Sequence, residues 1–175
     1  MINEIVWGGR IHIEKFILNI DAPPAIINRK FAAISIRDPM NRPISFPPWM
    51  NLVLCLDFPD VIPPTDDLSK EAKEFLRQFH LNYRVMTVEQ ADKIVRFLDA
   101  IEKDNQSISL LVNCEAGISR SAAIVRFVKG VIARPIQTQS LSIGNFEFAN
   151  RHVAKLLEEN WMERVRKDVT RNARP

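Results

Sequence analysis

The side chains best suited to chemistry lie in one short stretch, Cys114-Glu-Ala-Gly-Ile-Ser-Arg120-Ser121, which follows the largely apolar run 109–113. A loop between a strand and a helix can aim several backbone N–H groups at one point, where the helix N-terminus also favours an anion. A thiol at that point is stabilised as the nucleophilic thiolate, and the guanidinium of Arg120 can bind two phosphate oxygens at once. The stretch therefore predicts a phosphate-binding loop with Cys114 as its nucleophile.

The apolar residues around this loop follow a pattern in which strands alternate with helices. We expect strands at residues 11–20, 32–36, 51–56 and 108–113, and helices at residues 66–79, 87–103, 121–133 and from 150 to beyond 161. This order predicts an α/β fold, a single domain over residues 1–175 with a central, mostly parallel sheet flanked by helices. Such sheets bind ligands beyond the carboxyl ends of their strands, which is where Cys114 is placed.

Several local signals refine this expectation. Thr87-Val-Glu-Gln90 is typical of a capping box that opens a helix, and Asn150 is a suitable N-cap for the last helix. The continuous apolar run 51–56 predicts a strand covered on both faces, and the proline-rich residues 41–48 predict a loop. Arg37-Asp38-Pro39 predicts a turn in which Arg37 and Asp38 form a local ion pair, with contacts at the rim of the site as the alternative.

Composition limits the class of protein. With 175 residues, 46% hydrophobic and 26% charged, the chain fits one globular domain with a sizeable core. No apolar stretch approaches the ~18 residues of a membrane span, and the N-terminus lacks the pattern of a secretory leader. Two cysteines, Cys55 and Cys114, are too few for a disulfide framework. We therefore expect a cytoplasmic protein with no membrane partner.

Charge and histidine content point away from nucleic acids and metals. The net charge is only +3, and much of the excess lies in the basic tail at residues 163–175, which we expect to be a solvated, frayed helix end. An anionic partner for this tail is the alternative, but the absence of aromatic residues after Trp161 gives little support for nucleic-acid binding. His12, His80 and His152 have no metal-ligand spacing among themselves or with the cysteines, so neither a metal nor another cofactor is expected.

The run from Cys114 to Ser121 resembles the signature of the cysteine-dependent protein tyrosine phosphatase superfamily, which is Cys, five residues, Arg, then Ser or Thr. The chain is most similar to the compact dual-specificity and bacterial tyrosine-phosphatase-like branch, including Gly117 in the middle of the loop. The likeness extends over about residues 34–158, because residues 148–157 resemble the opening of the last helix of small dual-specificity phosphatases. It implies a phosphomonoester hydrolase that forms a cysteinyl-phosphate intermediate on a phosphorylated protein or peptide, above all on phosphotyrosine.

The resemblance also assigns roles to residues. Phe58-Pro59-Asp60 resembles the family's Trp-Pro-Asp, which makes Asp60 the expected general acid, with Asp57, Asp66 and Asp67 as alternatives. The gap from Asp60 to Cys114 is longer than in compact members, and a helical insertion at about residues 66–86 accounts for it. Ser121 matches the hydroxyl that assists breakdown of the phosphocysteine. The substrate-binding residues carried over from the family's loop are Glu115, Ala116, Gly117, Ile118, Ser119 and Arg120.

Two other functions, and a second role for Cys55, stay open. Asn113 stands where the family usually has the His that supports the nucleophile, which allows a catalytically weak phospho-residue-binding module. A rhodanese-like or arsenate-reducing enzyme also uses a cysteine and an arginine around an oxyanion. Glu115, expected at the rim, and the absence of lysine from the loop argue against inositol phosphates. Cys55 is expected to be a small buried hydrophobic residue, or, if its strand neighbours that of Cys114, a redox partner of the nucleophile.

Overall fold

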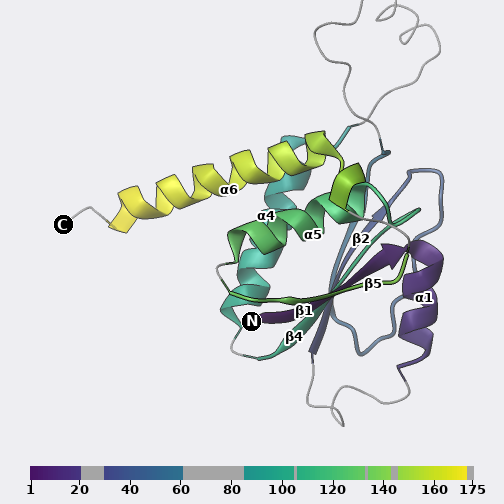
Figure 1. The fold of residues 1–175 in the computed structure, drawn as a ribbon. Coiled ribbons are helices and arrows are strands. Elements are labelled where there is room, and N and C mark those ends of the chain that lie inside the picture. The colour runs from purple at the N-terminus through teal and green to yellow at the C-terminus, as the bar shows by residue number, and fades with distance from the viewer. Residues whose placement is uncertain (21–29, 61–84, 105, 133, 143–145, 173–175) are drawn as a thin grey trace, which may run out of the picture.

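A parallel sheet brings the ends of five strands to one edge of the molecule. The computed structural model describes residues 1–20, 30–60, 85–104, 106–132, 134–142 and 146–172. The strands within these residues pair in the order β3-β2-β4-β1-β5, and every pair is parallel (Figure 1). Their bounds are β1 Ile2–Gly9, β2 Lys30–Arg37, β3 Leu52–Asp57, β4 Ile108–Cys114 and β5 Gln137–Ser140. The predicted single α/β domain with a mostly parallel sheet is confirmed.

Helices cover both faces of this sheet. The helix α1, Arg10–Leu18, lies on one face, and α4, Val88–Lys103, α5, Arg120–Val131, and α6, Arg151–Asn172, lie on the other (Figure 1). A short 3-10 helix, Phe146–Phe148, precedes α6. The expected helices 87–103 and 121–133 are thus confirmed as α4 and α5. The expected helix 66–79, within the proposed insertion 66–86, lies outside the described residues.

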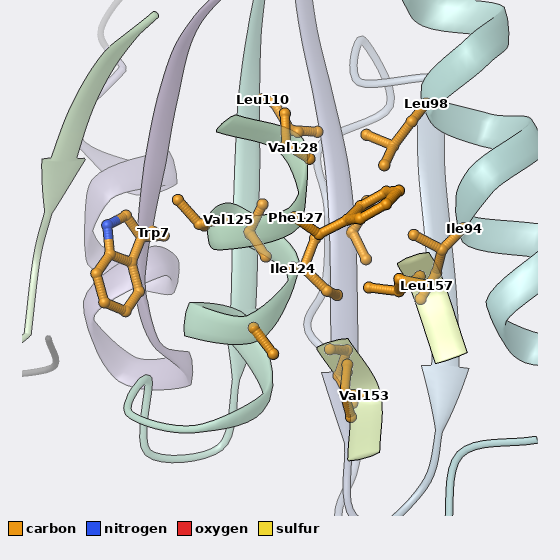
Figure 2. Close-up of a cluster of buried hydrophobic side chains, with 14 of the residues drawn as sticks. Trp7, Ile94, Leu98, Leu110, Ile124, Val125, Phe127, Val128, Val153 and Leu157 are labelled. Carbon is orange, nitrogen blue, oxygen red and sulfur yellow. The ribbon is translucent and has the colours of Figure 1, made fainter. Parts of the chain in front are cut away.

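The central strand β4 supplies side chains to both layers, because successive residues of a strand point to opposite faces. Leu110 belongs to the larger core with Leu98 of α4, Ile124 of α5 and Leu157 of α6 (Figure 2), whereas Leu111 belongs to the core beneath α1. All of these side chains are at most 4% exposed. Burying a large aliphatic side chain stabilises a fold by roughly 1.5–3 kcal/mol, so the strand that carries Cys114 is held from both sides.

The N-terminal residues differ most from expectation. Residues 11–20 were expected to be a strand, but residues 10–18 form the helix α1. Ile11 and Ile13 alternate as in a strand, yet Ile13, Phe16 and Ile17 have the helical spacing that packs against the sheet, while Ile11 is 63% exposed. The strand β1 before it was not predicted, although it lies between β4 and β5 inside the sheet.

Among the described residues β3 is an edge strand and is only partly covered, with Leu52 and Leu54 packed against one core and Val53 against the other. Residues 52–54 are half-buried and Cys55 is exposed, so the expectation of a buried Cys55 is wrong. The expectation that its strand neighbours that of Cys114 is also wrong, because β2 lies between β3 and β4. Two strand spacings of ~4.8 Å exceed the ~7 Å between Cα atoms that a disulfide can bridge. Cys55 is therefore no redox partner of Cys114 in this arrangement.

The basic tail is helical rather than frayed. The helix α6 continues to Asn172, and the described side chains from Val165 to Arg171 are exposed. Its middle is tied to the body where Arg164 pairs with Asp99 of α4 at 2.6 Å. In the described part of the chain no helix is both long and apolar enough to span a membrane.

The predicted capping box is present and can be tested through stability. The Oγ1 of Thr87 accepts a hydrogen bond from the Gln90 N–H at 3.2 Å, and the Gln90 Oε1 accepts one from the Thr87 N–H at 2.9 Å. Thr87→Ala removes the first of these bonds and is expected to lower the free energy of unfolding by about 1 kcal/mol. Thr170→Ala, on the exposed end of α6, is the control and should change it by less than ~0.5 kcal/mol in urea denaturation. Equal effects of the two substitutions would contradict this role for Thr87.

Candidate functional site

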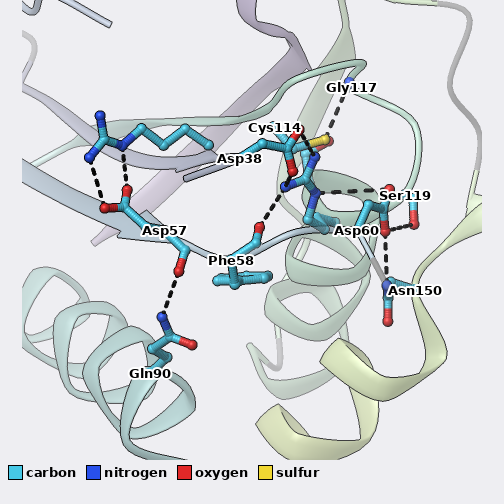
Figure 3. Close-up of polar contacts among 12 residues, drawn as sticks. Asp38, Asp57, Phe58, Asp60, Gln90, Cys114, Gly117, Ser119 and Asn150 are labelled. Atoms are coloured by element: carbon cyan, nitrogen blue, oxygen red, sulfur yellow. Dashed lines mark hydrogen bonds and ion pairs between the residues drawn. The ribbon is translucent and has the colours of Figure 1, made fainter. Parts of the chain in front are cut away.

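The loop that joins β4 to α5 wraps around the sulfur of Cys114. Cys114 is the last residue of β4 and is 1% exposed. The N–H of Gly117 donates to its Sγ at 3.3 Å, and the Oγ of Ser121, in the first turn of α5, lies 3.3 Å from the same sulfur (Figure 3). The Gly117 N–H uses the sulfur as its acceptor, and in the pair with Ser121 either atom can be the donor. The structure therefore brings together the predicted nucleophile, loop and hydroxyl.

The end of β1 explains why the loop takes this shape. Gly117 has φ +73°, and a Cβ on it would lie 1.9 Å from the N of Gly9 and 2.2 Å from the C of Gly8. The N–H of Arg10 donates to the carbonyl of Glu115 at 3.1 Å, and the Oγ of Ser142 donates to that of Gly117 at 2.9 Å. Sequence reasoning missed this support, and the Gly8-Gly9 pair after the apolar residues 5–7 is the signal that could have revealed it.

Arg120 is buried, at 2% exposed, and most of its donors are occupied. Its Nη1 donates to Asp38 Oδ1 at 2.9 Å and to the carbonyl of Phe58 at 2.6 Å, and its Nη2 donates to Asp38 Oδ2 at 3.3 Å (Figure 3). The Nε has no hydrogen-bond partner among the described residues, and Asp60 Oδ2 lies 3.8 Å from it. A buried donor without a partner is costly, so this edge of the guanidinium is suited to an oxyanion.

Asp60 lies beside this edge of the guanidinium and forms an ion pair with it. Its Oδ1 accepts hydrogen bonds from the Oγ of Ser119 at 2.8 Å and from the Nδ2 of Asn150 at 2.9 Å. Asn150 also caps α6, as predicted, because its Oδ1 accepts from the N–H of Val153 at 3.1 Å. The bond from Asn150 to Asp60 was not predicted, since it joins residues 90 positions apart. The structure thus places the predicted acid at the loop.

The alternative acids are less suitable or not described. Asp57 is held by Arg37, whose Nη2 donates to Asp57 Oδ2 at 2.8 Å and whose Nε donates to Oδ1. These hydrogen bonds lower the pKa of Asp57, so less of this carboxyl carries a proton near neutral pH and it is less suited to act as a general acid. Asp66 and Asp67 lie outside the described residues.

The expected ion pair between Arg37 and Asp38 does not form. Arg37 is the last residue of β2 and pairs with Asp57 across the neighbouring strand β3, whereas Asp38 pairs with Arg120. Neighbouring side chains at the end of a strand point in opposite directions, which separates these two charges. Asp38 therefore lies at the site, which agrees with the alternative of a rim contact rather than with the expected ion pair, although its pairing with Arg120 was not predicted.

The remaining loop residues surround the nucleophile. Asn113 is 3% exposed and lies in β4 between Gly8 of β1 and Ser35 of β2. Glu115, expected at the rim, is half-buried, and its Oε2 has no hydrogen-bond partner among the described residues. Ile118 is 39% exposed at the rim. No group of three or more His, Cys, Asp or Glu side chains suited to a metal occurs in the described part of the chain.

The tight packing of Gly117 can be tested against a second glycine. Gly117→Ala places a methyl group against backbone atoms of β1 and forces φ +73° on a residue with a side chain. We expect a loss of stability of more than ~1–2 kcal/mol, the cost of that backbone conformation alone. Gly130→Ala is the matched control, because nothing lies within 4 Å of its Cβ, and it should stabilise α5 by about 0.5–1 kcal/mol. Denaturant unfolding that ranks the two variants the other way would refute the loop geometry.

Comparison with known proteins gave no relative to which these residues could be matched. No model of a known protein family matches the chain, and no curated protein matches it at a significant level. The chemistry of the loop is therefore inferred from its own residues and their geometry.

Proposed function

We propose that this protein is a phosphomonoester hydrolase that acts through a cysteinyl-phosphate intermediate. One observation carries the proposal: a buried cysteine, whose sulfur accepts from the Gly117 N–H, and a buried arginine, whose Nε makes no hydrogen bond among the described residues, stand at the two ends of one loop, and the Asp60 carboxyl forms an ion pair with that Nε at 3.8 Å. A nucleophile, an oxyanion site and a proton donor are the three parts that such a hydrolysis requires. The resemblance of Cys114–Ser121 to the tyrosine phosphatase signature supports the same conclusion.

In the first step the Cys114 thiolate attacks phosphorus opposite the ester oxygen. The S–P bond forms while the P–O ester bond breaks, and Asp60 gives its proton to the leaving oxygen. Arg120 and the backbone N–H groups of residues 115–120 hold the three equatorial oxygens. Because these donors are fixed by packing before the substrate arrives, positioning and electrostatic stabilisation supply most of the rate.

In the second step water hydrolyses the phosphocysteine. The Asp60 carboxylate takes a proton from water as the water oxygen attacks phosphorus, and the S–P bond breaks to return the Cys114 thiolate. Ser121, whose Oγ is 3.3 Å from Sγ, donates to the sulfur as it departs. The product is inorganic phosphate, and no electrons are gained or lost by the protein.

The substrate that fits best is a phosphorylated protein side chain, phosphotyrosine above all. The five residues between Cys114 and Arg120 contain no lysine and one acid, Glu115. An acidic loop without a second cation repels ligands that carry several phosphates. A single phosphate on a protein surface avoids this repulsion.

A phospho-residue-binding module is the second candidate. It is favoured by Asn113, which stands beside the nucleophile without any possible charge. In such a module the loop would bind the phosphate and release it unchanged. Parent protein that binds phosphotyrosine but releases no inorganic phosphate would identify this function.

The nucleophile is tested with an aryl phosphate. Cys114→Ser should abolish phosphate release, because the serine hydroxyl is a far weaker nucleophile than a thiolate. Its binding of the substrate, measured by calorimetry, should remain within a few-fold of that of the parent. Phosphate release by Cys114→Ser at the parent rate would rule out the phosphocysteine.

The acid is tested with a pH–rate profile. Asp60→Asn should lower kcat by roughly 10²–10⁴-fold for a poor leaving group and remove the basic limb of the profile. Asp57→Asn is the matched control, because this carboxyl is already held by Arg37, and its profile should match that of the parent. If Asp60→Asn keeps both the rate and the basic limb, the acid is another residue.

A further inference from the structure

We infer that Asp38 is a positioning residue, which turns the guanidinium of Arg120 so that the edge formed by Nε and Nη2 is presented to the phosphate. The inference rests on the proposed function, because it deepens the account of the same oxyanion site. A positioning residue acts through another side chain and does not touch the substrate. Asp38 meets that description, since its carboxylate contacts Arg120 and its side chain is 35% exposed against 3% for that of the arginine.

The hydrogen bonds of Arg120 leave one edge of its guanidinium without a hydrogen-bond partner among the described residues. An arginine has five N–H groups, one on Nε and two on each Nη. Those of Nη1 are directed to Asp38 and to the carbonyl of Phe58, and one of Nη2 is directed to Asp38. Among the described residues no hydrogen bond is made by the N–H of Nε or by the second N–H of Nη2, which lie parallel on one edge of the planar group, and the Asp60 carboxylate forms an ion pair with Nε at 3.8 Å. Two parallel donors match two phosphate oxygens.

The turn that carries Asp38 is itself held in place. The N–H of Asn41 donates to the carbonyl of Asp38 at 2.9 Å, which closes the turn, and Arg37 Nη1 donates to the carbonyl of Asn41 at 3.0 Å. The N–H of Phe58 donates to the carbonyl of Arg37 at 3.2 Å, which joins this turn to the segment after β3. The Asp38 carboxylate is thus placed before any ligand arrives, and this lowers the cost of ordering Arg120 on binding.

Charge and geometry give opposite expectations for the loss of Asp38. If its carboxylate acted only as a charge, removing it would make the loop more positive and would tighten the binding of an anion. If it holds the guanidinium in place, removing it frees Arg120 to rotate and weakens the binding. The sign of the change in affinity therefore separates the two roles.

The test uses the full chain with Cys114→Ser, which binds without turnover, and inorganic phosphate as the probe in calorimetry. Adding Asp38→Asn should raise Kd by about tenfold or more, the effect of losing one hydrogen bond to a charged group. Asp38→Glu keeps the charge but moves it by one methylene, so it should weaken binding by an intermediate factor. Asp99→Asn is the matched control, because Asp99 also pairs with an arginine, Arg164 at 2.6 Å, but between α4 and α6 and away from the loop, and it should change Kd by less than twofold.

Each outcome decides the matter. The inference is overturned if the protein with Asp38→Asn binds phosphate as tightly as the Cys114→Ser parent, or more tightly. It is also overturned if that parent binds no phosphate. If Asp38→Asn fails to fold, as an altered thermal unfolding curve would show, Asp38→Glu with unchanged Kd overturns it in the same way. Turnover is measured separately, on the wild-type protein. If phosphate binding depends on Asp38 but the wild-type protein hydrolyses no phosphomonoester, the proposed function is refuted and the role of Asp38 stands.

Discussion

The buried guanidinium of Arg120 is the charge on which the arrangement of the site depends. A charge removed from water is tolerated only where it is paired and hydrogen-bonded, and here its partners come from two other parts of the chain, Asp38 after β2 and the carbonyl of Phe58 after β3. Arg120 itself begins α5. Pairing this one charge therefore brings the ends of β2, β3 and β4 together. It also brings Asp60 close, because Asp60 lies two residues after Phe58. In the proposed function, the contacts that pair this charge also build the phosphate site.

The parallel sheet supplies the frame in which these contacts form. The loop after β4 rests on Gly8 and Gly9 at the end of β1, with no space for a side chain at Gly117. Donors fixed in this way need little reorganisation when charge develops on a phosphoryl group, which is the main source of catalysis in phosphoryl transfer. With donors held this rigidly, the proposed reaction would need few residues beyond the loop, one carboxyl and the groups that hold them.

Sequence alone predicted the parts of this site that are local. The stretch Cys114–Ser121 carries its own strand, loop and helix start, and the Thr87 capping box and the Asn150 cap depend on residues three positions away. Contacts between distant segments were not predicted, such as Asp38 with Arg120 and Asn150 with Asp60, because a charge in a turn has many possible partners until the sheet order is known. The alternation of Ile11 and Ile13 indicated a strand, and only the packing of Ile13 and Ile17 on the sheet decides for a helix. The strand β1 was missed because Asn3 and Glu4 interrupt its apolar pattern, although it lies inside the sheet and pairs with both β4 and β5.

In the proposed mechanism the phosphoryl group is transferred to the sulfur of Cys114, and rapid acid quenching tests this transfer most directly. Asp60→Asn protein mixed with an aryl phosphate that has a good leaving group should accumulate the intermediate, because formation then needs little acid assistance while its hydrolysis lacks the base. Mass spectrometry of the quenched protein should find one phosphoryl group on the peptide that contains Cys114 and none in Cys114→Ser, Asp60→Asn protein. Aryl phosphate hydrolysis at an undiminished rate with no label on Cys114, or a label on another residue, would contradict the account.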